Sequence, residues 1–208
     1  MARLRKGFNG LLIGAAILGF VGLLAIFVTG DFGAAQYILN GIEARALANQ
    51  STISDRLVLK ALYQVMIISG KWRYPRAGEF LAYYCSGQGD TLHFDAKPLL
   101  RHPEMQLALR HHKQAITFRH QPQRNPQHHV VRHTDWDLYY AFDLLFIRQK
   151  YGRVSLYDQY YFQPLARKSH TPFHFGKIHF KLNDGLIHVA YPAAKMFTTY
   201  GEAALGTP

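Results

Sequence analysis

Residues 157–162, followed by Arg167 and His170, include the side chains that most suggest chemistry. If this stretch is a strand, Asp158 shares a face with the apolar residues of that strand and points into the core. A buried carboxylate needs a partner or a metal, because removing an unpaired charge from water is costly. Arg167 or His170 could supply that partner. Two interpretations stay open: an acid–base or metal-binding site, and a structural aspartate satisfied by backbone or arginine groups.

The twelve histidines raise the question of a metal site. A zinc site needs three or four converging ligands, normally with cysteine or carboxylate among them. The chain has one cysteine and no HExxH motif, so scattered surface histidines are the alternative and no metal is assigned. The dense groups are His111 with His112, His128 and His129 with His133, and His170 with His174.

The single cysteine, Cys85, excludes an internal disulfide. Its neighbours in FLAYYCSG are mostly apolar, which predicts a small buried residue rather than a nucleophile.

Helical periodicity dominates the first half of the chain. Apolar residues recur at helical spacing over 34–48 and 55–68, and residues 51–55 offer N-cap candidates between these two helices. A short third helix is predicted over 76–85, where Gly87 and Gly89 follow as turn residues, and another helix opens at Pro103.

The second half of the chain alternates with a period of two, as strands do. Strands are predicted over 142–148, 153–162 and 177–182, after a short one at 92–95. The turn Asn183-Asp184-Gly185 predicts that residues 186–191 return as a paired strand. Helices first and mainly antiparallel strands afterwards predict an α+β fold.

Residues 7–30 carry no charge and are long enough to cross a membrane. This predicts an N-terminal transmembrane helix, with a cleaved signal peptide as the alternative. Arg3, Arg5 and Lys6 precede the segment, so the N-terminus is predicted to be cytoplasmic and the remainder exported to the periplasm or cell exterior. Gly10 and Gly14 have a spacing that would allow a homodimer through the anchor.

The predicted organisation is therefore an anchor over 1–31 and one exported α+β domain over 32–208, helical over 34–110 and β-rich over 115–200. The formal net charge of +11 makes this domain basic, and 14% of the chain is aromatic. The predicted partners are the membrane, and an envelope protein, an anionic lipid or a glycan. Nucleic acid is a further class of partner, and the inferred export argues against it.

Three segments together resemble the layout of colicin M-type domains: FLAYYCSGQGD over 80–90, Leu92-His-Phe-Asp95, and Val154-x-Leu-x-Asp158-x-Tyr160-x-Phe162. The resemblance covers about residues 80–175. It implies magnesium-dependent cleavage of the lipid-linked peptidoglycan precursor, with Asp158 and Tyr160 in the catalytic cluster and Arg167 and His170 assisting. Tyr161 stands where that family has a second aspartate.

Two functions follow. The leading prediction is a membrane-anchored envelope protein whose basic, aromatic-rich exported domain binds a partner without catalysis. The alternative is a metal-dependent hydrolase of a lipid-linked phosphate, in which Mg²⁺ is the cofactor and Asp158 acts as the acid–base group or metal ligand.

Overall fold

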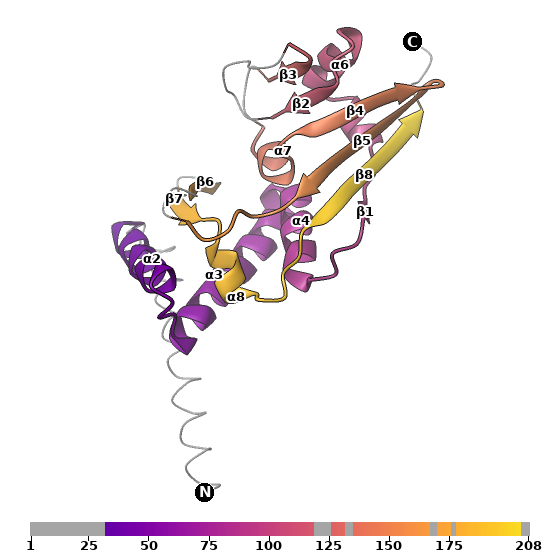
Figure 1. The fold of residues 1–208 in the computed structure, drawn as a ribbon. Helices are drawn as coiled ribbons and strands as arrows, with labels where there is room; N and C mark the ends of the chain where they lie inside the picture. The colour runs from indigo at the N-terminus through magenta and orange to yellow at the C-terminus, as the bar shows by residue number, and fades with distance from the viewer. Residues whose placement is uncertain (1–31, 119–125, 132–134, 167–169, 176–177, 205–208) are drawn as a thin grey trace, which may run out of the picture. The chain divides into compact units, whose positions relative to one another are not determined.

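The computed structural model describes residues 32–204, apart from 119–125, 132–134, 167–169 and 176–177 (Figure 1). These residues form two compact units. The first consists of 32–66 with 162–193, and the second of 67–161 with the segment that starts at residue 194. Each unit draws on both the helical part predicted over 34–110 and the β-rich part predicted over 115–200.

The first unit combines helices with one hairpin. Its elements are α2 (Phe32–Leu47), the first part of α3 (Ile53–Arg73), the antiparallel strands β6 (His170–Phe175) and β7 (Ile178–Asn183), and α8 (Leu186–Ala190).

Helix α3 begins with an N-terminal cap in which Thr52 and Asp55 each bind the other's backbone N–H, within the segment predicted to hold the N-cap. The Asp55 backbone N–H donates to Thr52 Oγ1 at 3.1 Å, and the Thr52 N–H donates to Asp55 Oδ2 at 2.9 Å. This is a capping-box arrangement, which satisfies donors that the first helical turn leaves unpaired. Arg45 in the last turn of α2 donates two hydrogen bonds to the Asp55 carboxylate, at 2.9 and 2.6 Å, and so ties the two helices together.

The strand predicted over 186–191 is wrong, because this segment is the helix α8 and β7 pairs with β6 instead. Asn183 Oδ1 accepts from the Gly185 N–H at 3.1 Å, so the turn leads into a helix rather than a hairpin. Leu186, Ile187 and Ala190 are buried, at a spacing that lies on one face of a helix.

The second unit is built on a six-stranded mixed sheet in the order β1-β8-β5-β4-β2-β3. The pairs β1–β8 and β2–β3 are parallel and the other three are antiparallel. The strands are β1 (Leu92–His93), β2 (Ala115–Thr117), β3 (His128–Val130), β4 (Leu145–Lys150), β5 (Arg153–Tyr160) and β8 (Phe197–Ala204). Its helices are α4 (Pro75–Ser86), α5 (Lys97–Leu100), α6 (Pro103–Arg110) and α7 (Trp136–Ala141), with the end of α3.

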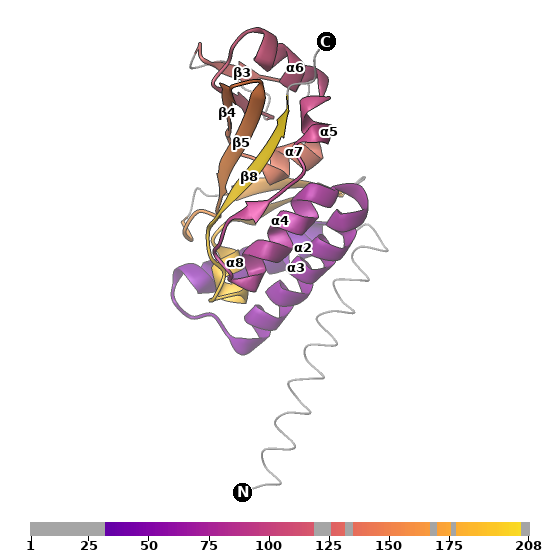
Figure 2. The same ribbon diagram turned by 90° about the vertical axis from the view of Figure 1, so that its right-hand side faces the viewer.

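Helices α4, α5 and α7 lie on one side of strands β4, β5 and β8 (Figure 2). The core between them is aromatic. Phe80 of α4 makes edge-on contacts with Phe142, Tyr160 and Phe197, with ring centroids 5.4–5.9 Å apart. Such T-shaped pairs add to the burial of apolar area that holds a helix on a sheet.

Two glycines allow close approach in this core. A Cβ on Gly78 of α4 would lie 2.6 Å from the Lys71 backbone nitrogen, so the start of α4 fits against α3 only without a side chain. A Cβ on Gly201 of β8 would lie 2.6 Å from the ring of Phe94, which covers that point of the strand.

The fold-class prediction was right about α+β and wrong to include a transmembrane helix. None of the helices within the described part of the chain is long and apolar enough to cross a membrane. The longest of them, α3, has 21 residues but carries charges along its length, including Asp55, Lys60 and Lys71. The segment predicted as the anchor, 7–30, lies outside the described residues. The fold class is therefore corrected to α+β with a mixed sheet.

Candidate functional site

Asp158 lies on β5 and points into the core as predicted, with 6% of its surface exposed. Its two oxygens accept hydrogen bonds from backbone N–H groups: Oδ2 from Asp143 at 2.9 Å and Oδ1 from Gln159 at 2.7 Å. Burial raises the pKa of the carboxyl group to about 7, and it outweighs these N–H groups, which lower the pKa. Asp158 thus joins β5 to the turn before β4 with both oxygens occupied, which agrees with the structural interpretation.

Of the other predicted catalytic residues, only Tyr160 belongs with Asp158 to the described part of the second unit. Tyr160 is buried and packs against Phe80. His170 belongs to the first unit, where its Nε2 lies 2.9 Å from Glu43 Oε2. Arg167 lies outside the described residues. The colicin M-type resemblance and the magnesium-dependent hydrolase therefore stay predictions.

The predicted histidine groups give no metal centre in the described part of the chain, which holds no cluster of three or more His, Cys, Asp or Glu side chains that could bind an ion. His129 Nε2 lies 2.7 Å from Glu104 Oε2, and His102 Nδ1 accepts from the Glu104 N–H at the start of α6. His133 and the side chain of His174 lie outside the described residues.

Cys85 is not activated. Burial raises the pKa of its thiol to about 12, so the nucleophilic thiolate is scarce at neutral pH. The side chain is half-buried, whereas the sequence predicted a buried residue, and the raised pKa favours a structural role over a nucleophile.

The face of the sheet opposite the helices carries a row of aromatic side chains. Successive residues of a strand point to opposite faces, so buried Leu156 and exposed Tyr157 mark the two faces of β5. Directly paired residues share a face, and the register pairs Phe146 with Tyr157, Tyr157 with Tyr200, and Tyr200 with His93. Four neighbouring strands, β4, β5, β8 and β1, thus each contribute one ring to the same row.

The rings in this row contact one another in two pairs. Those of Phe146 and Tyr157 are nearly parallel, at 15°, with centroids 5.2 Å apart, and those of Tyr200 and His93 meet edge to face at 5.6 Å. Phe146 is 37% exposed and Tyr157 is 42% exposed. Their side chains are therefore held in place by their neighbours and still reach solvent.

Cations lie beside the aromatic row on the same face. Arg148 and Lys150 follow Phe146 at every second residue of β4, and Arg153 of β5 lies opposite Lys150. Arg153 forms a salt bridge with Glu202, which is the exposed carboxylate of this face on β8. No described carboxylate forms a salt bridge with Arg148 or Lys150, so these two charges are uncompensated within the described residues.

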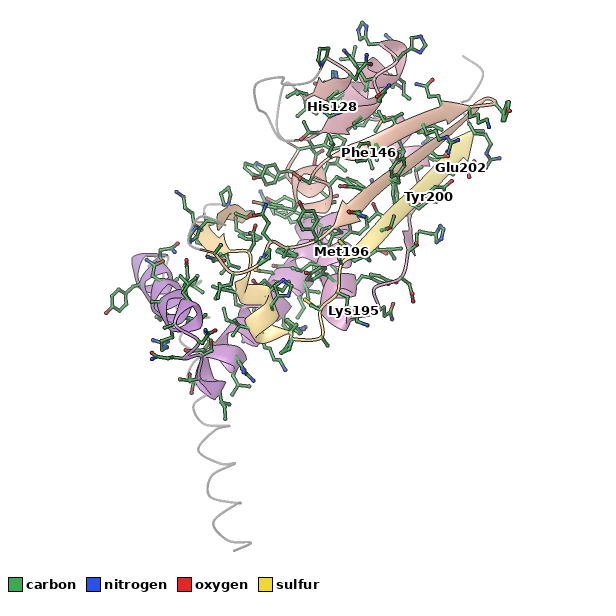
Figure 3. All side chains as sticks on the ribbon, viewed as in Figure 1. His128, Phe146, Lys195, Met196, Tyr200 and Glu202 are labelled. Atoms are coloured by element: carbon green, nitrogen blue, oxygen red, sulfur yellow. The ribbon has the colours of Figure 1, made fainter. Side chains whose placement is uncertain are left out.

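We call this surface the open sheet face. It consists of the aromatic row His93, Tyr200, Tyr157 and Phe146 and the cations Arg148, Lys150 and Arg153. Figure 3 labels Phe146 on β4 and Tyr200 and Glu202 on β8.

The first unit contains a pocket. It has a volume of about 520 Å³, and its lining includes Arg56, His188 and mostly apolar groups. None of its lining residues is a carboxylate, so the lining offers no acid–base pair. The residues that complete it are Ser51, Pro164, Leu165, Gly185, Val189 and Pro192.

Comparisons of this chain with family models, with curated proteins and with solved structures find no match. The arrangement of its own side chains is therefore the basis for a functional assignment.

Sequence reasoning identified one residue of the open sheet face. With Asp158 predicted to point inward, the alternation of a strand puts the neighbouring Tyr157 on the opposite face, as the structure has it. Sequence reasoning did not predict β8, and hence missed Tyr200 and its pairing with Tyr157. The signal in β8 is an alternation of inner Phe197, Thr199 and Ala203 with outer Thr198, Tyr200 and Glu202.

Proposed function

We propose that this protein is a binding protein whose open sheet face binds an elongated anionic partner. The observation that carries the proposal is the row of four rings in register across four strands, flanked by the uncompensated cations Arg148 and Lys150. The rings offer apolar contact area at a low cost in side-chain entropy, and the cations favour a negatively charged partner.

Binding explains these residues better than fold stability does. Phe146 and Tyr157 keep 37% and 42% of their surface exposed, so each leaves apolar area in water that a bound partner would cover. Two cations on one strand without opposing carboxylates also repel each other, and a bound anion would remove that repulsion.

The Asp158 environment supports binding over catalysis at this unit. Both carboxylate oxygens are taken by backbone donors, and the side chain points away from the open sheet face. A proton donor or acceptor in a reaction must reach the reacting group, and Asp158 is buried on the helical side.

Retention of the full chain on immobilised heparin, with elution by a salt gradient, tests this function. Wild type is expected to be retained, and the double variant Arg148→Gln/Lys150→Gln to elute at distinctly lower salt. Lys97→Gln/Arg110→Gln removes the same charge from exposed positions on α5 and α6, and should elute close to wild type.

Equal shifts for both double variants would show that retention depends on net charge alone, and would overturn the assignment to the open sheet face. Absence of retention for the wild type would overturn the anionic partner itself.

A further inference from the structure

We infer that the anionic partner is a single-stranded nucleic acid, whose bases contact the aromatic row while its phosphates lie along the cations. This inference rests on the proposed function and names the class of its partner. The sequence-based argument against nucleic acid depended on the predicted export, and the segment behind that prediction, 7–30, lies outside the described residues.

The ring geometry leaves room for bases. Carbon atoms in contact lie about 3.5–4 Å apart, so two rings that overlapped fully would have centroids near that separation. The centroids of Phe146 and Tyr157 are 5.2 Å apart at 15°, so the two rings are offset and each leaves part of its face uncovered. Partly uncovered aromatic faces, fixed in orientation, are what unpaired bases stack on.

The combination of rings and cations favours nucleic acid over other polyanions. Acidic glycans and anionic lipid headgroups supply charge but no aromatic groups to stack on Tyr157 or Tyr200. A neutral glycan needs acceptors for its hydroxyl groups, whereas the Glu202 carboxylate is already engaged by Arg153 and by the Tyr200 hydroxyl. A membrane surface is typically bound by four to eight clustered basic residues, and the open sheet face has three.

Spacing supports a short single strand. Adjacent strands lie about 4.8 Å apart, so a row across four strands extends roughly 14 Å. Arg148 follows Phe146 by two residues, which places its row about 7 Å farther along the strands. Lys150 lies two residues farther along β4, beside Arg153 of β5, so the charges extend along these strands from the Phe146 end of the aromatic row. The backbone of a strand whose bases contact Phe146 and Tyr157 would pass over these charges.

Unpaired bases suit this surface better than a duplex does. Base pairing stacks the bases on one another and hides their faces, and grooves are normally read by a protruding helix or ribbon. The open sheet face presents its rings from a sheet surface, so it is suited to unpaired bases.

Fluorescence anisotropy of a labelled twelve-nucleotide oligothymidylate, titrated with the full chain, tests the inference. Tyr157→Leu should raise the Kd about tenfold, since a stacked base contributes a factor of roughly five to over a hundred. Tyr157→Phe keeps the ring and should bind like wild type. Tyr37→Leu, at an 81% exposed position in the first unit, is the matched control and should also bind like wild type.

The salt dependence supplies a second readout. In Arg148→Gln/Lys150→Gln, the slope of log K against log salt concentration should become shallower by about 1.4, because two phosphate contacts are lost. A labelled duplex of the same length should bind more weakly than the single strand.

The outcomes separate this inference from the proposed function. Retention on heparin without oligothymidylate binding would overturn the nucleic-acid inference and leave the anionic binding surface standing. Failure of both probes would overturn both. Oligothymidylate binding that Tyr157→Leu leaves unchanged would overturn the stacking site.

Discussion

Asp158 should make the free energy of unfolding depend on pH with an unusual sign. Its carboxyl group titrates near 3.8 when unfolded and at about 7 in the folded protein, because burial favours the protonated form. Between these values the unfolded chain releases a proton that the native state retains. The contribution of Asp158 to stability is therefore complete below about pH 4 and is lost as the pH rises to about 7.

The size of this effect follows from the pKa difference. Each pH unit in the window corresponds to about 1.4 kcal/mol, so the contribution of Asp158 amounts to ~4 kcal/mol at most. Asp158→Asn removes the titration. The amide oxygen can accept from one of the two backbone N–H groups, but the amide nitrogen then faces the second N–H group, donor against donor. This should lower the free energy of unfolding by about 1–3 kcal/mol at pH 4.

Urea unfolding of wild type and Asp158→Asn from pH 4 to pH 8 measures both terms. The variant should be less stable at pH 4, and the difference should shrink or reverse by pH 7. Asp90→Asn, at an exposed carboxylate, is the control and should follow the wild-type pH profile. If Asp158→Asn kept the wild-type slope between pH 4 and pH 7, the reasoning about the buried carboxyl group would be refuted.

Three further predictions concern the packing and reactivity of the chain. Asp55→Ala removes the α3 cap and the partner of Arg45, and should lower the free energy of unfolding by about 1–3 kcal/mol in urea unfolding. Arg45 lowers the pKa of Asp55, so this loss should be full at pH 7 and fade as the pH falls below about 4; a loss that grew in acid would contradict it. Gly78→Ala places a methyl group 2.6 Å from the Lys71 nitrogen, and should lower the thermal midpoint and reduce the free energy of unfolding by about 1–3 kcal/mol. The control is Gly152→Ala, whose methyl group meets no atom within 4 Å, so it measures only the destabilisation from a positive φ. Cys85 is half-buried with a raised pKa, so it should react with a thiol-specific disulfide reagent more slowly in the native protein than in urea, and equal rates would contradict this.

Local signals in the sequence predicted α2, α3, α4 and α6, but they did not predict the short helices α5 and α7 and gave a strand in place of α8. The periodicity over 34–48 and 55–68 corresponds to α2 and α3, and Pro103 does begin α6. The helix predicted over 76–85 is α4, which ends at the left-handed Gly87. These features depend on residues close together in the chain, so a single sequence contains them.

Features that depend on distant pairing were not predicted. Strand β8 lies between β5 and β1, and its inner face carries Gly201 because the Phe94 ring occupies that space. A strand whose buried face carries Thr199, Gly201 and Ala203 lacks the strong apolar alternation that identifies strands.

The surroundings of Asp158 and the open sheet face were also predicted only in part, because they too depend on distant pairing. Burial of Asp158 followed from its position on β5, but its Asp143 donor comes from a turn fifteen residues away. Likewise, the alternation in β5 identified Tyr157 as outward-facing, whereas the neighbouring rings come from β4, β8 and β1. The open sheet face exists only in the assembled sheet.

Protection of individual tyrosines from nitration tests the central claim most directly. The full chain would be treated with a nitrating reagent with and without saturating heparin, and each tyrosine quantified by peptide mass spectrometry. Heparin should reduce nitration of Tyr157 and leave the exposed Tyr37 of the first unit unchanged. Equal protection of both tyrosines, or protection of Tyr37 alone, would contradict binding at the open sheet face.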